Sequence, residues 1–280
     1  MSEHTLNRRE VLTAAAAAGA VAGTGIPDEA AAQTKRVPGV QLYTVRDSMA
    51  TDMEKTLRAV AGIGYREVEF AGYFGHNSSE VRAMLERFGL DSPSTHINAE
   101  NVEDDPSAFV EHAGIVGHTY VTIAWIQPQN RQTIDDYKRW AAVANRLGEV
   151  CRANGMRAAY HNHDFEFQPL EGELPINVLL SETDAELVDI ELDFFWVRKA
   201  GWEIRDALAL SPDRMALSHI KDIDPADNMV SVGDGIIDFA GILADPVASG
   251  IKHCFVEHDN PEDPFRSVAA SHFAMKSILG

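Results

Sequence analysis

The hydrophobic positions of the chain follow two alternating spacings, one typical of buried strands and one typical of amphipathic helices. Short apolar runs predict strands near residues 40–43, 67–70, 92–97, 120–125, 157–162, 187–193, 215–220 and 252–257. Stretches with apolar residues at helical spacing predict helices near residues 52–61, 79–88, 106–115, 134–154, 176–181, 201–210, 238–244 and 264–278. Ser78 or Ser79 is the expected N-cap of the helix at 79–88.

This alternation predicts an α/β fold, and a single (β/α)8 TIM barrel over residues 35–280 fits it best. Eight strands that are each followed by a helix match a closed barrel of about 250 residues. A doubly wound open sheet shows the same alternation, but it usually carries a glycine-rich phosphate-binding turn after its first strand. The corresponding turn here, residues 44–47, contains no glycine.

The first residues predict an export signal that precedes the fold. Arg8 and Arg9 stand before an apolar stretch, residues 13–25, that consists mostly of Ala and Gly. This stretch is too short to cross a bilayer comfortably, and the alanines at 30–32 resemble a signal cleavage site. The arginine pair resembles a twin-arginine signal, so we expect residues 1–34 to direct export to the periplasm or the extracellular space. No membrane-spanning segment is expected in the mature chain. An Ala-rich tail with an incidental arginine pair is the alternative.

The charge balance argues against a nucleic-acid partner. The chain carries 24 Lys and Arg against 43 Asp and Glu, which gives a formal net charge of -19. Such an excess repels the phosphate backbone, and no local basic stripe reverses it. Cys151 and Cys254 are too few for a disulfide framework, and we expect two buried free thiols.

Polar residues follow the predicted strands at their carboxyl ends, where the active sites of TIM barrels lie. They are Gln41, Tyr43, Glu69, His96, Gln127, His161, His163, Glu166, Asp193, Trp196, His219, Lys221, Asp222, Glu257 and His258. Ionisable groups are costly to leave without solvent, a partner or a metal, so a convergent set indicates a functional site. For any one of them alone, a solvated loop residue or a helix cap is the better interpretation.

Asp193, His219 and Glu257 come directly after the apolar runs of three neighbouring predicted strands. One imidazole and two carboxylates suit a divalent cation such as Mn, Mg, Co or Zn. The sequence therefore predicts one divalent metal ion, with a fourth ligand from the end of the fifth strand, residues 160–167.

Six segments together resemble the xylose isomerase-like TIM barrel superfamily, and within it the bacterial sugar phosphate isomerases/epimerases. The segments are residues 39–47, 160–167, 192–196, 219–222, 233–238 and 255–258. Each is weak alone, but their order on predicted strand ends and loops is specific for the superfamily. The resemblance runs from about residue 40 to the C-terminus and does not specify the substrate.

The resemblance implies one catalytic metal held by Glu, Asp, His and Glu from the fifth to the eighth strands. Asp193, His219 and Glu257 match that pattern, but the fifth strand ends in His161 where many relatives have a glutamate. Inosose-dehydratase-like relatives similarly follow His-x-His with a later glutamate, so Glu166 is the expected fourth ligand. Metal binding by an imidazole of the fifth strand, that of His161 or of the histidine two residues later, is the alternative. The other histidine would then support a ligand through a hydrogen bond.

The DNA-repair endonucleases and ketose epimerases of the superfamily carry a histidine three residues after the strand-six aspartate, where this chain has Trp196. The resemblance therefore implies no trinuclear zinc site, and Trp196 is expected to bind the C–H face of a sugar ring. Packing beside Phe194 and Phe195 is the alternative. Glu69 and His96 are expected to bind substrate hydroxyls opposite the metal, with local loop-ordering hydrogen bonds as the alternative.

A divalent ion bound to a sugar carbonyl and its adjacent hydroxyl stabilises a developing enediolate as a Lewis acid, while a positioned base moves the neighbouring proton. The candidate acid and base groups are His163, Lys221 and, as the resemblance implies, Glu257. Lys221 lies two residues from His219, so both side chains are expected on the same face of the strand. An ion pair of Lys221 with Asp222 or Glu257 is the alternative.

These observations predict an exported, metal-dependent sugar isomerase or epimerase that acts on an unphosphorylated carbohydrate. No arginine cluster or phosphate-binding loop indicates a phosphorylated substrate. The segment 219–222 resembles the dehydratase and keto-sugar hydratase relatives, so a lyase of keto-sugars or inososes is the second prediction. A non-catalytic sugar-binding protein is the alternative of another class, disfavoured because binding alone needs no convergent His, Asp and Glu. The expected partner is a small sugar, and a homo-oligomer is compatible with the sequence.

Overall fold

The structure is a computed structural model that describes residues 36–280. The predicted signal peptide, residues 1–34, lies outside these residues. Within the described part, the first strand begins at Pro38 and the last helix ends at Leu279.

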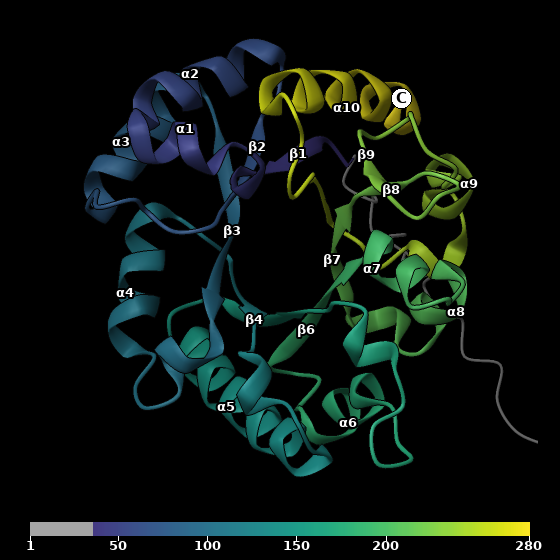
Figure 1. Cartoon of the computed structure of the whole chain (residues 1–280). Coiled ribbons are helices and arrows are strands. Elements are labelled where there is room, and N and C mark those ends of the chain that lie inside the picture. The colour runs from purple at the N-terminus through teal and green to yellow at the C-terminus, as the bar shows by residue number, and fades with distance from the viewer. Residues whose placement is uncertain (1–35) are drawn as a thin grey trace, which may run out of the picture. The chain divides into compact units, whose positions relative to one another are not determined.

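Parallel strands form a closed barrel at the centre of the described chain (Figure 1). They are β1 (Pro38–Gln41), β2 (Glu67–Phe70), β3 (Asp91–Asn98), β4 (Tyr120–Trp125), β5 (Arg157–His161), β6 (Val188–Asp193), β7 (Met215–Ile220) and β10 (His253–Val256). The strands from β1 to β7 are neighbours in chain order, and β10 closes the ring between β7 and β1. The predicted α/β class and the (β/α)8 TIM barrel are confirmed.

Helices surround the barrel on its outer side (Figure 1). They are α1 (Arg46–Thr51), α2 (Met53–Ile63), α3 (Ser78–Phe88), α4 (Ser107–Val116), α5 (Ile134–Ala153), α6 (Pro175–Glu182), α7 (Phe194–Lys199), α8 (Ile204–Ala209), α9 (Phe239–Leu243) and α10 (Pro264–Leu279). Their apolar faces pack on the outward side chains of the strands, as Trp140 of α5 does in the largest core cluster. No helix of residues 36–280 has both the length and the apolar character that a bilayer-spanning helix needs.

The pleat of the strands decides which side chains line the barrel interior. On β6, Ile190 and Leu192 pack into the apolar cluster beneath the helices. Because successive side chains of a strand point to opposite faces, Asp189, Glu191 and Asp193 line the interior. All three are buried. Buried carboxylates are unfavourable unless they are paired or bind a cation. The carboxylates of β6 therefore need partners in the interior of the barrel.

The largest departure from the predicted elements follows β6. Asp193 ends the strand and also caps α7, because its Oδ1 accepts a hydrogen bond from the backbone N–H of Trp196 at 2.9 Å. The chain therefore forms α7 at once, and the helix predicted at 201–210 begins only with α8 at Ile204. A smaller difference concerns the first strand, which ends at Gln41 because residues Leu42–Val45 form a 3-10 turn.

The cap of α3 is Asn77, which corrects the prediction of Ser78 or Ser79. The Asn77 side chain accepts a hydrogen bond from the backbone N–H of Glu80, and the Glu80 side chain accepts one from the backbone N–H of Asn77. This reciprocal capping box satisfies two backbone donors of the first turn, so the helix starts at Ser78.

Cys151 and Cys254 are both free and buried, as predicted. Burial raises the pKa of the Cys151 thiol to about 12 and that of the Cys254 thiol to about 11. Both thiols are therefore protonated at neutral pH and act as small apolar side chains of the core.

One carboxylate organises the segment that follows β7 at the barrel mouth. Asp222 begins β8 (Asp222–Ile223), which pairs with β9 (Met229–Val230) as an antiparallel ribbon. The buried Asp222 side chain accepts hydrogen bonds from four backbone N–H groups, those of Ile223, Gly233, Gly235 and Ile237. A Cβ at position 235 would overlap this carboxylate, so glycine is required there.

Replacing Asp222 should therefore unfold this segment and destabilise the protein. We expect Asp222→Ala to lower the free energy of unfolding by at least about 3 kcal/mol, because it leaves several buried N–H groups without an acceptor. Chemical denaturation measures this change, and amide hydrogen exchange should accelerate in residues 229–238. Asp224→Ala is the matched control, since Asp224 accepts from exposed N–H groups of the same loop. Equal effects of the two variants would contradict the assignment.

Candidate active site

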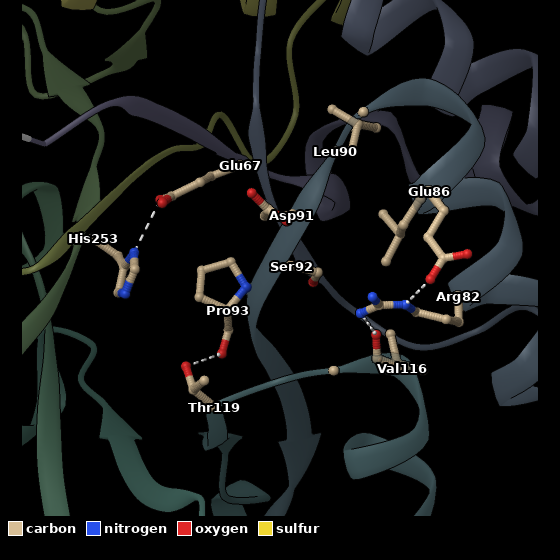
Figure 2. A pocket seen from close by; sticks show the side chains of 13 residues that line it. Glu67, Arg82, Glu86, Leu90, Asp91, Ser92, Pro93, Val116, Thr119 and His253 are labelled. Carbon is tan, nitrogen blue, oxygen red and sulfur yellow. Dashed lines mark hydrogen bonds and ion pairs between the residues drawn. The ribbon is translucent and has the colours of Figure 1, made fainter.

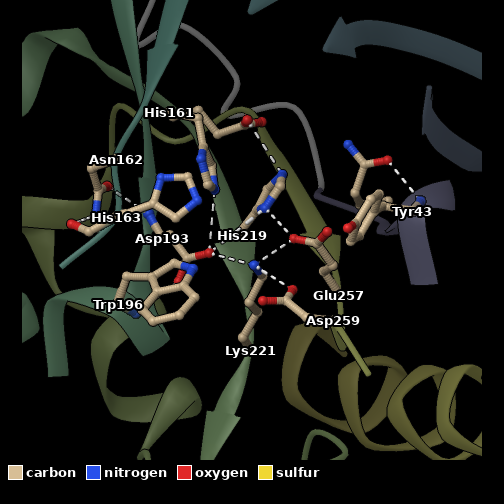
Figure 3. Close-up of polar contacts among 12 residues, drawn as sticks. Tyr43, His161, Asn162, His163, Asp193, Trp196, His219, Lys221, Glu257 and Asp259 are labelled. Carbon is tan, nitrogen blue, oxygen red and sulfur yellow. Dashed lines mark hydrogen bonds and ion pairs between the residues drawn. The ribbon is translucent and has the colours of Figure 1, made fainter. Parts of the chain in front are cut away.

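Four side chains from β5, β6, β7 and the segment after β10 meet at the carboxyl end of the barrel (Figure 3). His161, Asp193, His219 and Glu257 each offer a nitrogen or oxygen atom, and these atoms all lie within 4.8 Å of one another. Asp193 Oδ2 is 3.3 Å from His161 Nε2, and His219 Nδ1 is 2.8 Å from Glu257 Oε2. We call these four residues the outer group. All four are buried.

Lys221 places its ammonium group beside the same carboxylates (Figure 3). Its Nζ is 3.0 Å from Asp193 Oδ2, 2.6 Å from Glu257 Oε2 and 2.9 Å from Asp259 Oδ1. Burial alone would lower the pKa of Lys221, but these carboxylates raise it well above its ordinary value. Lys221 is therefore charged at neutral pH. Of the two ion pairs expected for Lys221 from the sequence, the one with Glu257 is present. The one with Asp222 is not, because backbone N–H groups donate to the Asp222 carboxylate.

The outer group has the donor set of a divalent cation site. Two imidazoles and two carboxylates form the mixed nitrogen and oxygen set that Mn, Co and Zn accept. Burial would raise the pKa of Asp193 and of Glu257, but the Lys221 ammonium lowers both, so both are ionised. The buried Nδ1 of His219 points toward Glu257 without a well-formed hydrogen bond. A bound cation would satisfy this nitrogen, so the residues present fit the predicted metal.

Glu166 lies outside the outer group, which corrects the first choice for the fourth ligand. Its Oε1 accepts a hydrogen bond from the Tyr160 hydroxyl, and its Oε2 accepts one from the backbone N–H of His163, both at 2.7 Å. Burial raises the pKa of Glu166 to about 7. His161, the alternative from the same strand, lies in the outer group instead.

A second set of side chains lies one strand layer deeper in the barrel. Glu69, His96, Glu191 and His219 also bring donor atoms within 4.8 Å of one another. His96 Nε2 is 2.6 Å from Glu191 Oε2, and His219 Nε2 is 2.7 Å from Glu69 Oε2. We call these residues the inner group. His219 belongs to both groups, because its Nε2 faces the inner carboxylates and its Nδ1 faces Glu257.

The inner group gives Glu69 partners inside the barrel. Its side chain is fully buried, and its Oε2 also accepts a hydrogen bond from Gln41 Nε2 at 2.7 Å. Glu69 therefore pairs with His219 inside the barrel, and its expected contact with a substrate hydroxyl stays a prediction. The His96 side chain is 11% exposed, so the predicted contact with a sugar hydroxyl stays open for it. Burial would lower the pKa of His96, but Glu69 and Glu191 raise it to about 9.

Aromatic rings line the mouth beside the outer group. The His163 ring stacks on Phe165 with 5.1 Å between centroids, meets Trp125 edge-on at 4.8 Å and lies 5.5 Å from Trp196. Burial lowers the pKa of His163 well below its ordinary value, so its ring is neutral at pH 7. Trp196 is half-buried, and its indole Nε1 has no hydrogen-bond partner. The side chains around Trp196 thus form an apolar wall, in which the indole Nε1 is buried without an acceptor.

Two acidic residues of the site were not predicted from the sequence, Glu191 and Asp259. Glu191 stands two residues before Asp193 on β6, so the alternation that places Asp193 in the interior also places Glu191 there. That spacing is a signal that sequence reasoning overlooked. Asp259 follows β10 in a loop, where no strand periodicity indicates the direction of its side chain.

A cavity of about 500 Å³ opens at the opposite, amino end of the strands (Figure 2). Four of its charged residues already have partners, since His253 Nδ1 lies 3.0 Å from Glu67 Oε2 and Arg82 Nε lies 2.7 Å from Glu86 Oε1. The amino end of a TIM barrel usually contributes to stability, whereas catalysis occurs at the carboxyl end. The mouth with the outer group is therefore the candidate active site.

Curated relatives align with about two-thirds to three-quarters of this chain. The inosose dehydratase of Salmonella typhimurium is 24% identical over 230 residues, which cover 68% of this chain and 75% of the relative. The inosose dehydratase of Geobacillus kaustophilus is 22% identical over 249 residues, which cover 74% and 78%.

Solved structures show the same barrel. A sugar phosphate isomerase/epimerase from Parabacteroides distasonis superposes with a TM-score of 0.77 and 23% identity, covering 87% of this chain and 94% of that one. The IOLI protein, solved with a bound zinc atom, superposes with a TM-score of 0.67 and 13% identity, covering 87% and 98%. An L-ribulose 3-epimerase has a TM-score of 0.67 and 15% identity, covering 86% and 93%. The family model described as "Xylose isomerase-like TIM barrel" matches residues 57–272, and the chain therefore belongs to this family.

Proposed function

We propose that this protein is an exported sugar isomerase or epimerase that uses a divalent metal ion and acts on an unphosphorylated carbohydrate. The observation that carries the proposal is the outer group, with its four convergent donors beside a charged lysine at the barrel mouth. A divalent cation held by these residues would polarise a sugar carbonyl as a Lewis acid. The zinc in a structural neighbour and the mixed donor set support this assignment.

The residues around the outer group supply the proton chemistry that such a reaction needs. His163 is neutral, which is the protonation state required of a proton acceptor. Lys221 is charged and points to the same site, so its ammonium can donate a hydrogen bond to a developing oxyanion. Glu257 contacts both Lys221 and His219 and is the third candidate for proton transfer.

The mouth suits a neutral sugar better than a phosphorylated one. The aromatic wall around Trp196 offers apolar surface for the C–H face of a sugar ring. The Lys221 ammonium already forms ion pairs with three carboxylates, which compensate its charge. The Arg131 guanidinium donates to the Ile126 carbonyl and lies over the Phe165 ring. Neither cation is thus left to bind a phosphate dianion.

A dehydratase acting on keto-sugars or inososes is the second candidate. It is favoured by the position of Lys221, whose ammonium could protonate a departing hydroxyl after the first proton transfer. The names of the curated relatives support it as well, since they are inosose dehydratases. Both candidates begin with removal of a proton next to a carbonyl, and they differ in whether a hydroxyl then leaves.

Metal analysis tests the site itself. We expect Asp193→Asn and His161→Gln each to reduce the bound divalent metal of the purified protein by about one ion per chain, because each removes a ligand of the outer group. Glu166→Gln should retain the metal content of the wild type, since the Glu166 carboxylate is directed at Tyr160. Elemental analysis by mass spectrometry measures the content. A loss with Glu166→Gln and none with His161→Gln would reverse the ligand assignment.

Solvent isotope exchange tests the chemistry. Incubation with candidate ketoses and aldoses in D2O should incorporate deuterium into a product of unchanged composition, and Lys221→Met should lower kcat by about 10²-fold or more with little change in KM. Asp189→Asn is the control, because Asp189 is a charged residue of the neighbouring strand β6 that pairs with Arg157 at the other end of the barrel. A product lighter by one water would select the dehydratase. Binding of sugars without exchange or turnover would contradict both reactions.

Export is tested by fractionation of cells. The proposal rests on Arg8 and Arg9 before the apolar stretch at 13–25. We expect the wild-type chain in the periplasm or the medium in a shortened form. Replacing both arginines by lysine should leave the full-length chain inside the cell. Equal distribution of the two forms would contradict the twin-arginine assignment.

A further inference from the structure

We propose that the inner group binds a second divalent cation, which shares the His219 imidazole with the outer site. The ligands are Glu69 from β2, His96 from β3, Glu191 from β6 and His219 from β7. This inference goes beyond the proposed function, because the outer site alone suffices for the proposed reaction. The argument rests on donor geometry, on two unpaired oxygens and on the local charge.

The donor atoms of the inner group are arranged around a common centre. His96 Nε2 lies 2.6 Å from Glu191 Oε2 and 3.2 Å from Glu69 Oε2. His219 Nε2 lies 2.7 Å from Glu69 Oε2 and 3.3 Å from Glu191 Oε2. Each nitrogen thus faces both oxygens. Metal–ligand bonds of about 2.0–2.1 Å in a tetrahedral site separate neighbouring ligand atoms by about 3.3 Å. Two of these four separations already match that value, and the 2.6 and 2.7 Å separations would have to widen by about 0.6 to 0.7 Å.

Two oxygens of the inner group have no partner in the described structure. Glu69 Oε1 and Glu191 Oε1 are both buried and without a hydrogen bond. Buried polar atoms are nearly always hydrogen-bonded, so each such atom needs an explanation. A cation bound between the two carboxylates could take these oxygens as additional ligands and raise its coordination number above four. That set of two imidazoles and two carboxylates suits Mn or Co as well as Zn.

The inner carboxylates also lack a fixed positive charge. Among residues 36–280, Glu69 and Glu191 form no ion pair with a lysine or an arginine. The carboxylates of the outer group, in contrast, have Lys221 at 2.6 to 3.0 Å. Among the described residues the inner group has no such ammonium, so a divalent cation would be the charge that compensates its two carboxylates.

His219 can serve both sites because its two ring nitrogens face different groups, and an imidazole that binds a cation through each nitrogen does so as the imidazolate, with both ring protons released. Its Nε2 faces Glu69 and Glu191, and its Nδ1 faces Glu257. Of the four side chains of the inner group, that of His96 is partly exposed and the other three are fully buried, so we infer that a cation would enter past His96. The inner cation would therefore lie beneath the outer one and would enter through the barrel mouth.

Crystals of the intact protein grown with MnCl2 test the inference directly. An anomalous difference map should show two manganese peaks per chain, one between Glu69 and Glu191 and one between Asp193 and Glu257. A peak at the outer position alone would overturn the second site and leave the proposed function intact. A peak at the inner position alone would support the second site and count against the proposed function. No peak at either position would overturn both.

A matched pair of variants on β6 tests the same inference in solution. Glu191 and Asp193 are two residues apart on the same strand and belong to different groups. With Mn²⁺ as the probe, Glu191→Gln and Asp193→Asn should each lose about half of the bound metal, and the double variant should lose nearly all of it. The electron paramagnetic resonance spectrum of the wild type should show coupling between two Mn²⁺ ions, and each single variant should lose it.

Unchanged metal content in Glu191→Gln, with one uncoupled Mn²⁺ in the wild type, would overturn the inference. Circular dichroism and a thermal melt of each variant report whether it folds. If Glu191→Gln does not fold, the wild-type spectrum and the anomalous map decide by themselves, because neither needs a variant.

Discussion

The site depends on one imidazole that is held between two carboxylates from distant parts of the chain. His219 Nε2 lies 2.7 Å from Glu69 Oε2, and its Nδ1 lies 2.8 Å from Glu257 Oε2. These residues belong to β2, β7 and the segment after β10, which come together only when the barrel closes. A shift of β7 by one residue would turn His219 toward the helices and remove it from both groups. Closure of the barrel and its strand register therefore decide whether a cation site exists at all.

Most of the fold could be predicted from local patterns, because each strand and helix buries an apolar surface with its own spacing. The strands at 67–70, 120–125 and 215–220 have the predicted bounds. The misplaced elements are those in which a side chain overrides the hydrophobic pattern. Asp193 caps α7 as soon as β6 ends, and this six-residue helix is too short to show a helical spacing of apolar residues. The cap of α3 was missed because a reciprocal hydrogen bond between side chain and backbone decides it.

The site could be predicted where strand position alone decides the direction of a side chain. Asp193 and His219 follow from that rule. The fourth donor did not, because two candidates lay close together in the sequence. Tyr160 packs outward in the apolar core, and its hydroxyl binds the Glu166 carboxylate there. His161 comes next on the strand and so points inward. The alternation of inward and outward residues on β5 indicated that His161 points into the barrel, but the resemblance to relatives with a glutamate favoured Glu166.

The charge inside the barrel supports the proposal that the two polar groups are cation sites. Lys221 forms ion pairs with three carboxylates, those of Asp193, Glu257 and Asp259. One ammonium cannot neutralise three carboxylates, and Glu69 and Glu191 lie beyond its reach. The remaining compensation must come from protonated imidazoles or from bound cations, since unpaired buried charges are strongly unfavourable. A cation that binds the folded barrel and not the unfolded chain also stabilises the fold, in proportion to the logarithm of its concentration above the dissociation constant. If the proposed cations bind, the same carboxylates would thus couple the stability of the barrel interior to the supply of metal ions.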